Sequence, residues 1–257
     1  MQPDVVAFDF DGVICDGLIE YFQTAWRAYC KLFKPNNVEP PTGLADQFYP
    51  LRPVIETGWE MPMLLRALII GKTAADIIAG WPDLAISLLR EVELTQAEAA
   101  NVLDSERDSW IATDLDSWLA QHQFYANMLS VLRVSLKNRP TYIVSTKEGR
   151  FIQQLLKRGG VAMPPEQVLG KEVKHPKYKT LRLLTSTHSS PHPPIIWFIE
   201  DRIKALQAVK QQPDLNHVEL FLADWGYNLA PERQAAQEDS RIHLLSLDSV
   251  VQKFGAA

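Results

Sequence analysis

The stretch VVAFDFDGVICDG, residues 5–17, joins an apolar run to two closely spaced carboxylates. Its first four residues are all apolar, which is typical of a strand whose two faces are both covered in a parallel sheet. We expect this strand at residues 5–9, with Asp9 at its end and Asp11 two residues further on. Ligands bind beyond the carboxyl ends of the strands in open parallel sheets. The stretch therefore predicts a ligand site at the end of the first strand.

The chain from about residue 126 onward alternates between short apolar runs and segments with helical periodicity. Strands are expected at 141–146, 195–200, 218–223 and 241–246, with a further short apolar piece at 167–170. Helices are expected at 126–138, 148–158, 176–186 and 201–212. This alternation predicts an α/β fold with a Rossmann-like, doubly wound parallel sheet.

The long interval between the first two strands has a different pattern. Residues 16–33 and most of 61–119 show helical spacing of apolar residues, and residues 34–60 are irregular and rich in proline. Thr95 and Glu98 have the spacing of a capping box at a helix start. No strand is expected within 16–125. We therefore predict an inserted all-helical cap domain at 15–125 and an α/β core made of 1–14 and 126–257.

Polar residues follow three of the expected strands. Asp9 and Asp11 follow the first, Ser145 and Thr146 end the second, and Glu200 and Asp201 end the strand at 195–200. Lysines cluster at the helix start KHPKYKT, at positions 174, 177 and 179. Clustered carboxylates repel one another and need a cation, and their hard oxygen atoms suit Mg²⁺. With a hydroxyl and an ammonium, such a metal forms a receptor for a phosphoryl group.

The two aspartates of the first stretch can divide the chemistry of phosphoryl transfer. A carboxylate can act as the nucleophile and form an aspartyl-phosphate. A second carboxylate, held differently by the turn at Gly12, can protonate the leaving oxygen and later activate water. We therefore expect Asp9 to attack phosphorus and Asp11 to move protons.

At this point four short motifs together resemble those of the haloacid dehalogenase-like hydrolase superfamily. They occur in the order VVAFDFDGV, YIVST, KHPKYKT and IIWFIED. Within that superfamily the chain looks most similar to phosphoglycolate phosphatase-like and β-phosphoglucomutase-like proteins with a helical cap. The segments STKEGRFIQQLLKRGGV and ADWGYN add to this similarity. The resemblance covers 1–14 and about 126–257.

The resemblance implies catalytic roles for residues that match the motifs. Asp9 would be the nucleophile and a Mg²⁺ ligand. Asp11 would be the general acid and base, with its backbone carbonyl also on the metal. Ser145 would donate hydrogen bonds to the phosphoryl oxygens, and we add Gly12 and Thr146 as substrate-binding residues.

The remaining motif residues are a lysine and an acidic pair. The lysine would neutralise phosphoryl charge, and we favour Lys177 because Leu181, four residues on, fits the buried face of the helix; Lys174 and Lys179 stay open as alternatives. Asp201, with Glu200, would complete the metal site. The pair is Glu-Asp here, where many members have Asp-Asp or Gly-Asp followed by a later Asp, so which of the two acids binds the metal directly and which acts through water stays open.

One stretch of the helical block, LRPVIETGWE at 51–60, mixes charge with an aromatic residue between prolines. We treat it as a candidate specificity loop in which Arg52 faces an anionic group; a surface loop with a core tryptophan is the alternative. The two cysteines, Cys15 and Cys30, lack a partner at metal-binding or redox spacing.

Bulk composition limits the classes of partner. The net charge of −5 gives no support for binding to nucleic acid or to an anionic membrane, because both require a basic surface.

We expect a cytoplasmic, Mg²⁺-dependent phosphatase that acts on a small phosphorylated metabolite. A phosphomutase of the β-phosphoglucomutase type and a non-catalytic binding protein are the alternatives.

Overall fold

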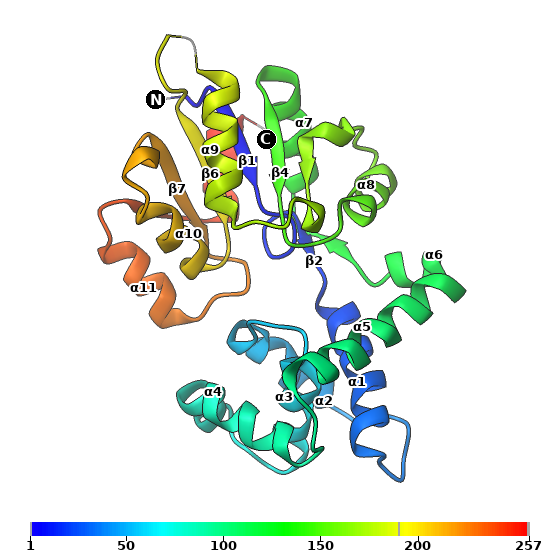
Figure 1. The fold of residues 1–257 in the computed structure, drawn as a ribbon. Helices are drawn as coiled ribbons and strands as arrows, with labels where there is room; N and C mark the ends of the chain where they lie inside the picture. Colours follow the sequence, from blue (N-terminus) through cyan, green and yellow to red (C-terminus); the bar gives the residue numbers. More distant parts are fainter. Residues whose placement is uncertain (1, 190, 256–257) are drawn as a thin grey trace. The chain divides into compact units, whose positions relative to one another are not determined.

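The computed structural model describes residues 2–189 and 191–255. The chain divides into two compact units, one made of Met1–Asp16 with Gln123–Ala257 and the other of Gly17–His122. The first is an α/β unit and the second is helical (Figure 1).

The α/β unit is built on a six-stranded sheet with the order β5-β4-β1-β6-β7-β8. The strands are β1 (Val5–Phe8), β4 (Thr141–Val144), β5 (Val168–Leu169), β6 (Ile196–Glu200), β7 (Val218–Ala223) and β8 (Ile242–Leu245). Every neighbouring pair is parallel. Because β1 lies between β4 and β6, the residues that follow these three strands emerge side by side at one edge of the sheet.

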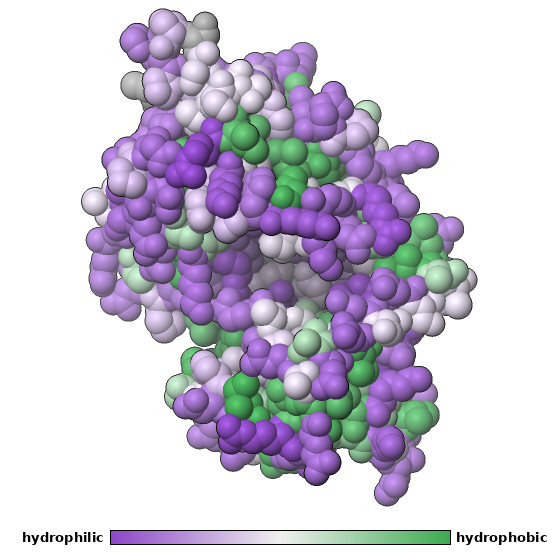
Figure 2. Space-filling model, in the orientation of Figure 1, coloured by the Kyte–Doolittle hydropathy of each residue, from purple (hydrophilic) through white to green (hydrophobic). Residues whose placement is uncertain are grey.

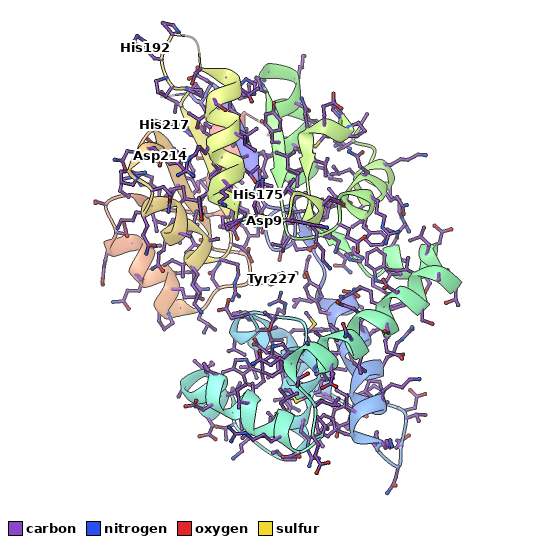
Figure 3. All side chains as sticks on the ribbon, in the orientation of Figure 1. Asp9, His175, His192, Asp214, His217 and Tyr227 are labelled. Atoms are coloured by element: carbon purple, nitrogen blue, oxygen red, sulfur yellow. The ribbon has the colours of Figure 1, made fainter. Side chains whose placement is uncertain are left out.

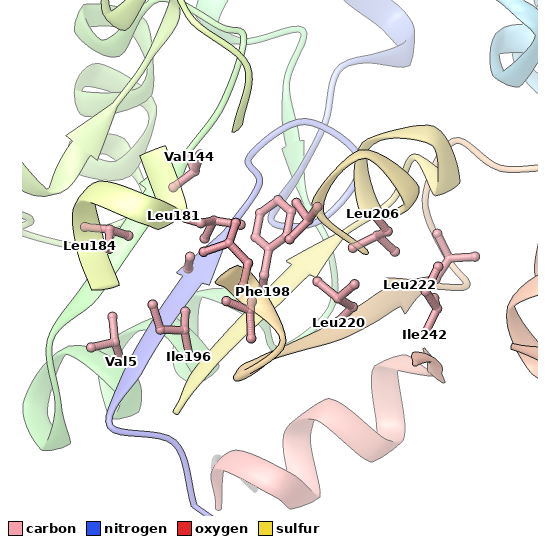
Figure 4. Close-up of a cluster of buried hydrophobic side chains, with 14 of the residues drawn as sticks. Val5, Val144, Leu181, Leu184, Ile196, Phe198, Leu206, Leu220, Leu222 and Ile242 are labelled. Atoms are coloured by element: carbon pink, nitrogen blue, oxygen red, sulfur yellow. The ribbon is translucent and has the colours of Figure 1, made fainter. Parts of the chain in front are cut away.

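Helices cover both faces of this sheet. The helices of the unit are α7 (Met128–Asn138), α8 (Gly149–Arg158), α9 (Lys177–His188), α10 (Ile203–Lys210), α11 (Ala230–Glu238) and α12 (Leu247–Phe254). On one face, side chains of α9, α10 and α11 pack with those of β1, β6, β7 and β8 in a buried apolar cluster (Figure 4). On the other face, the ring centre of Phe254 in α12 lies 5.7 Å from the ring centre of Phe8 and 5.8 Å from that of Trp197.

This architecture confirms the predicted fold class, a doubly wound parallel sheet with a helical second unit. Each expected strand is present, but β1 and β4 end earlier than expected, so Asp9, Ser145 and Thr146 lie in the loops beyond the strands. Helices α11 and α12 were not anticipated from the sequence. Hydrophilic side chains dominate the visible face of the α/β unit (Figure 2).

A short ribbon differs from the expectation that residues 16–125 contain no strand. β2 (Cys15–Asp16) pairs antiparallel with β3 (Gln123–Phe124), and each strand has only two residues. Such a pairing is too short to leave an alternating pattern in the sequence. Both strands belong to the α/β unit.

The helical unit contains α1 (Leu18–Phe33), α2 (Leu44–Phe48), α3 (Glu60–Ile69), α4 (Ala74–Arg90), α5 (Gln96–Thr113) and α6 (Leu115–Leu119). The proline-rich segment expected to be irregular holds α2 and a 3₁₀ helix at Tyr49–Val54. Thr95 and Glu98 form the predicted capping box at the start of α5. Within the described residues, none of the helices has the length and hydrophobicity needed to span a bilayer.

Candidate active site

A tight turn follows β1 and carries both aspartates of the first motif. The backbone N–H groups of Ile14 and Cys15 both donate to Phe10 O at 2.9 Å, and Gly12 N donates to Cys15 O at 2.8 Å. Gly12 has a φ of +84°, and a Cβ there would overlap the carboxylate of Asp201. Glycine is therefore required both for the left-handed backbone and for the close approach to Asp201.

Asp9 lies beside Lys177, the first residue of α9. Asp9 Oδ1 accepts a hydrogen bond from Phe10 N at 2.7 Å, and Lys177 Nζ lies 2.8 Å from Asp9 Oδ2. The same ammonium donates to Glu200 Oε2 at 2.6 Å. Lys177 thus bridges the carboxylate that follows β1 and the carboxylate that ends β6, and these charges keep the pKa of its ammonium above the ordinary value.

Three buried carboxylates gather around this lysine. One oxygen from each of Asp9, Glu200 and Asp201 can be chosen so that all three lie within 4.8 Å of one another. Burial is the main cause that raises the pKa of Asp9 to about 7, and repulsion from Glu200 is the second. Burial, followed by repulsion from Asp9, raises the pKa of Asp201 to about 6. Burial also raises the pKa of Glu200.

This cluster fits a divalent cation. Three buried carboxylates face one lysine, so their negative charge exceeds the positive charge that Lys177 supplies. Buried charges of one sign are costly unless a counter-ion offsets them, and oxygen ligands of this kind suit Mg²⁺. The oxygens of Glu200 are already engaged, because Oε2 accepts from Lys177 and Oε1 accepts from Arg202 N at 3.0 Å.

The loop after β7 holds Asp201 in place. Tyr227 N donates to Asp201 Oδ2 at 2.8 Å, and the side-chain amide of Asn228 donates to the backbone oxygen of Asp201 at 3.0 Å. The Tyr227 hydroxyl donates to Asp16 Oδ1 at 2.9 Å. Figure 3 labels Asp9 and Tyr227, and it shows His192 at the other end of the α/β unit from Asp9.

Asp11 pairs with a different lysine. This lysine, Lys147, lies in the loop that follows β4, and its Nζ is 3.2 Å from Asp11 Oδ1. Ser145 is buried in that loop, and its hydroxyl accepts from Lys147 N at 3.3 Å. Thr146 is exposed. The adjacent thiol of Cys15 is buried, and burial raises its pKa, so Cys15 is unsuited to act as a nucleophile.

The sequence-derived candidates therefore separate into distinct groups. Asp9, Lys177, Glu200 and Asp201 meet at one point, and Gly12 packs against Asp201. The other lysines considered at the α9 start, Lys174 and Lys179, are exposed.

Arg52 lies in the other compact unit, where its guanidinium donates to Ile55 O at 3.1 Å and stacks 4.8 Å from the ring centre of Tyr21. Its role in substrate binding stays a prediction.

Several residues at this site, Lys147, Tyr227 and Asn228 among them, were not identified from the sequence. Lys147 stands two positions after Ser145, and its place directly beyond an expected strand was a usable signal. Tyr227 acts on Asp201 through its backbone N–H, so its side-chain type carried no such signal. Residues that contribute backbone atoms are in general hidden from reasoning about side-chain chemistry.

Comparison with known proteins gives matches in structure only. No family model matches the sequence, and no curated protein matches it. A predicted phosphatase from Clostridium acetobutylicum has a TM-score of 0.60 at 14% identity, with 100% of both chains covered. A haloacid dehalogenase-like family hydrolase from Streptococcus pneumoniae has a TM-score of 0.59 at 13% identity, with 98% of both chains covered.

A predicted phosphoglycolate phosphatase from Haemophilus somnus has a TM-score of 0.58 at 15% identity and covers 98% of this chain and 97% of its own. At these identities the similarity establishes the fold. It covers both the α/β unit and the helical unit. The resemblance drawn from the four motifs is thus confirmed at the level of fold: the chain has the haloacid dehalogenase-like fold.

Proposed function

We propose that this protein is a Mg²⁺-dependent phosphatase that hydrolyses a small phosphorylated metabolite through an aspartyl-phosphate on Asp9. The observation that carries this proposal is the group of three buried carboxylates around Lys177 at the carboxyl edge of the sheet. The structural neighbours include predicted phosphatases, which supports the same reaction class.

Each residue of the site has a distinct task in this reaction. Asp9 is the nucleophile, and Lys177 offsets the negative charge that gathers as the carboxylate approaches a phosphoryl group. A bound Mg²⁺ would supply charge neutralisation for the phosphoryl oxygens. Asp9 and Asp201 would hold it directly, with the backbone of Asp11, and Glu200 would bind it or act mainly by anchoring Lys177.

The neighbouring loops provide the remaining groups. The Ser145 hydroxyl and the backbone after β4 hold the phosphoryl oxygens, with Thr146 beside them. Asp11 protonates the leaving oxygen in the first step and takes a proton from water in the second. The partial exposure of its carboxylate leaves it accessible to both the leaving group and water.

The test is phosphate release from a panel of phosphorylated metabolites, in Mg²⁺ and in a chelator, for wild type and Asp9→Asn. We expect Mg²⁺-dependent release that falls by about 10³-fold or more in the variant, because removal of a nucleophile abolishes the covalent route. Asp83→Asn, at an exposed position of α4, is the matched control and should keep full activity.

Two further measurements complete the test. Acid quench during turnover, followed by mass spectrometry, should find one phosphate on the peptide that contains Asp9. Conversion of a sugar phosphate to its isomer without release of phosphate would identify a phosphomutase instead. Equal activity of wild type and Asp9→Asn, with both proteins folded, would refute the assignment of the nucleophile.

A further inference from the structure

The second ion pair at this edge of the sheet joins Asp11 to Lys147. One ammonium contacts both carboxylate oxygens, because Lys147 Nζ lies 3.2 Å from Asp11 Oδ1 and 3.3 Å from Oδ2. The Lys147 side chain is 9% exposed, whereas that of Asp11 is 18% exposed. The carboxylate is thus more open to solvent than the ammonium that holds it.

Hydrogen bonds fix the backbone of the loop that carries this lysine. Lys147 O accepts from Lys171 N at 2.9 Å, and Lys147 N donates to the hydroxyl of Ser145 at 3.3 Å. Two residues further on, Gly149 N donates to Glu172 Oε1 at 2.6 Å. The backbone that carries Lys147 is therefore held in place by hydrogen bonds, and it belongs to the same loop as Ser145.

On the basis of the proposed function, we propose that Lys147 is the positioning residue for Asp11. The two lysines divide the work: Lys177 contacts the nucleophile Asp9, and Lys147 contacts the acid and base Asp11. A carboxyl group that rotates freely is a poor proton donor, because its productive orientation is only one of many. A contact to both oxygens restricts that rotation.

The pair also matches the charge changes of the reaction. In the first step a bond forms between Asp9 and phosphorus, the ester P–O bond breaks, and the proton of Asp11 passes to the leaving oxygen. Negative charge then develops on Asp11 beside the ammonium. In the second step water attacks phosphorus, the bond to Asp9 breaks, and a water proton returns to Asp11. Lys147 keeps its protons throughout.

The test compares two kinds of leaving group in Lys147→Met and Lys147→Arg. An alkyl phosphate needs a proton on its leaving oxygen, whereas 4-nitrophenolate departs without one. We expect Lys147→Met to lower kcat/KM for the alkyl ester about 10- to 100-fold, a part of what general acid–base catalysis contributes. The loss for 4-nitrophenyl phosphate should be much smaller. Lys147→Arg, which keeps a cation able to contact both oxygens, should recover part of the loss.

A matched control and the contrary outcomes make the comparison decisive. Lys157→Met removes a positive charge at an exposed position of α8 and should leave both substrates unaffected. Equal losses for the two substrates would overturn the positioning role, and so would a rise in KM with unchanged kcat, which would indicate substrate binding instead. If wild type releases no phosphate at all, the proposed function fails, and the role of Lys147 fails with it.

A measurement that does not use activity tests the ion pair itself. Thermal midpoints of Lys147→Met, Asp11→Asn and the double variant form a cycle. The double variant should shift the midpoint by less than the sum of the single shifts. Additive shifts would show that the two side chains do not interact. That result would overturn the inference regardless of the kinetic measurements.

Discussion

Both units of this protein bury carboxylates, but they treat the charge differently. In the helical unit, Glu20 Oε1 accepts from Thr24 Oγ1 at 2.7 Å, Arg107 Nε at 2.8 Å and Trp118 Nε1 at 3.1 Å. In the α/β unit, Asp9 and Glu200 share Lys177, and Asp201 is the third carboxylate of the buried cluster. The first group is matched by its own donors, and the second retains excess negative charge.

This difference separates an architectural use of charge from a functional one. A buried carboxylate with a full set of donors holds helices in register and has little capacity left for a ligand. A cluster whose charge is not neutralised is costly to fold and gains from a bound cation. The raised pKa values of Asp9 and Asp201 reflect that cost, because burial and the neighbouring carboxylates disfavour their ionised forms.

The largest predicted effect is the loss of the matched carboxylate. Glu20→Ala leaves the largely buried guanidinium of Arg107 without this partner, and breaking a buried pair in this way costs about 3–5 kcal/mol. Urea unfolding followed by circular dichroism should show that loss. Asp104→Ala is the control, because Asp104 contacts the same Arg107 at 3.4 Å from an exposed position and should have a small effect. Similar effects for the two variants would contradict the comparison.

A slightly smaller effect is predicted at the loop that supports the other cluster. A Cβ at Gly226 would overlap both Asp201 and the backbone oxygen of Gly12. Gly226→Ala should therefore cost about 3 kcal/mol, the upper end of the usual range for overpacking, and should weaken stabilisation by Mg²⁺. Gly80→Ala, at a position of α4 with open space around it, is the control. Unchanged stabilisation by Mg²⁺ in Gly226→Ala would place the metal away from Asp201.

The contrast also explains what could be predicted from the sequence. Strands β1, β4, β6 and β7 are apolar runs, so their existence was readable, and their ends placed Asp9, Ser145, Glu200 and Asp201 at one edge of the sheet. The parallel order then brought the side chains of Asp9, Glu200 and Asp201 together. Chemistry carried by side chains at strand ends is therefore visible in a sequence of this fold.

Other features left no such trace. Helix α11 is short and has a single buried residue, Ala236, so its apolar periodicity is weak. The Glu20 network joins residues up to 98 positions apart, and nothing local in the sequence marks Glu20 and Arg107 as buried partners. Long-range polar pairing of this kind depends on packing that no local pattern encodes.

The pH dependence of stability should differ between the metal-free and the metal-bound protein. The folded-state pKa of Asp9 is raised from 3.8 to about 7, so the folded protein binds more protons than the unfolded chain between these values. The contribution that Asp9 makes to stability in this way is therefore fully present below about pH 4 and is lost as pH rises through about 7. In a chelator, we expect unfolding at pH 8 to need about 2 kcal/mol less than at pH 5.5.

Calorimetry at both pH values, with and without Mg²⁺, checks this expectation. Added Mg²⁺ should restore stability at pH 8, because it binds the folded, ionised cluster. Asp9→Asn should flatten the pH dependence in the chelator. An equally steep decline in that variant would show that the excess charge of the α/β unit lies elsewhere.

The smallest predicted effect concerns helix caps, where the two units should behave alike. Thr95 Oγ1 accepts from Glu98 N at 3.3 Å in the helical unit, and Ser246 Oγ accepts from Ser249 N at 3.2 Å in the α/β unit. Each cap is a local interaction, so Thr95→Ala and Ser246→Ala should each cost about 1 kcal/mol in urea unfolding. Thr42→Ala, at an exposed position outside the helices, should change little. A much larger loss of unfolding free energy for one cap would mean that its helix start also stabilises the packing of its unit. The two units would then differ in more than their buried charges.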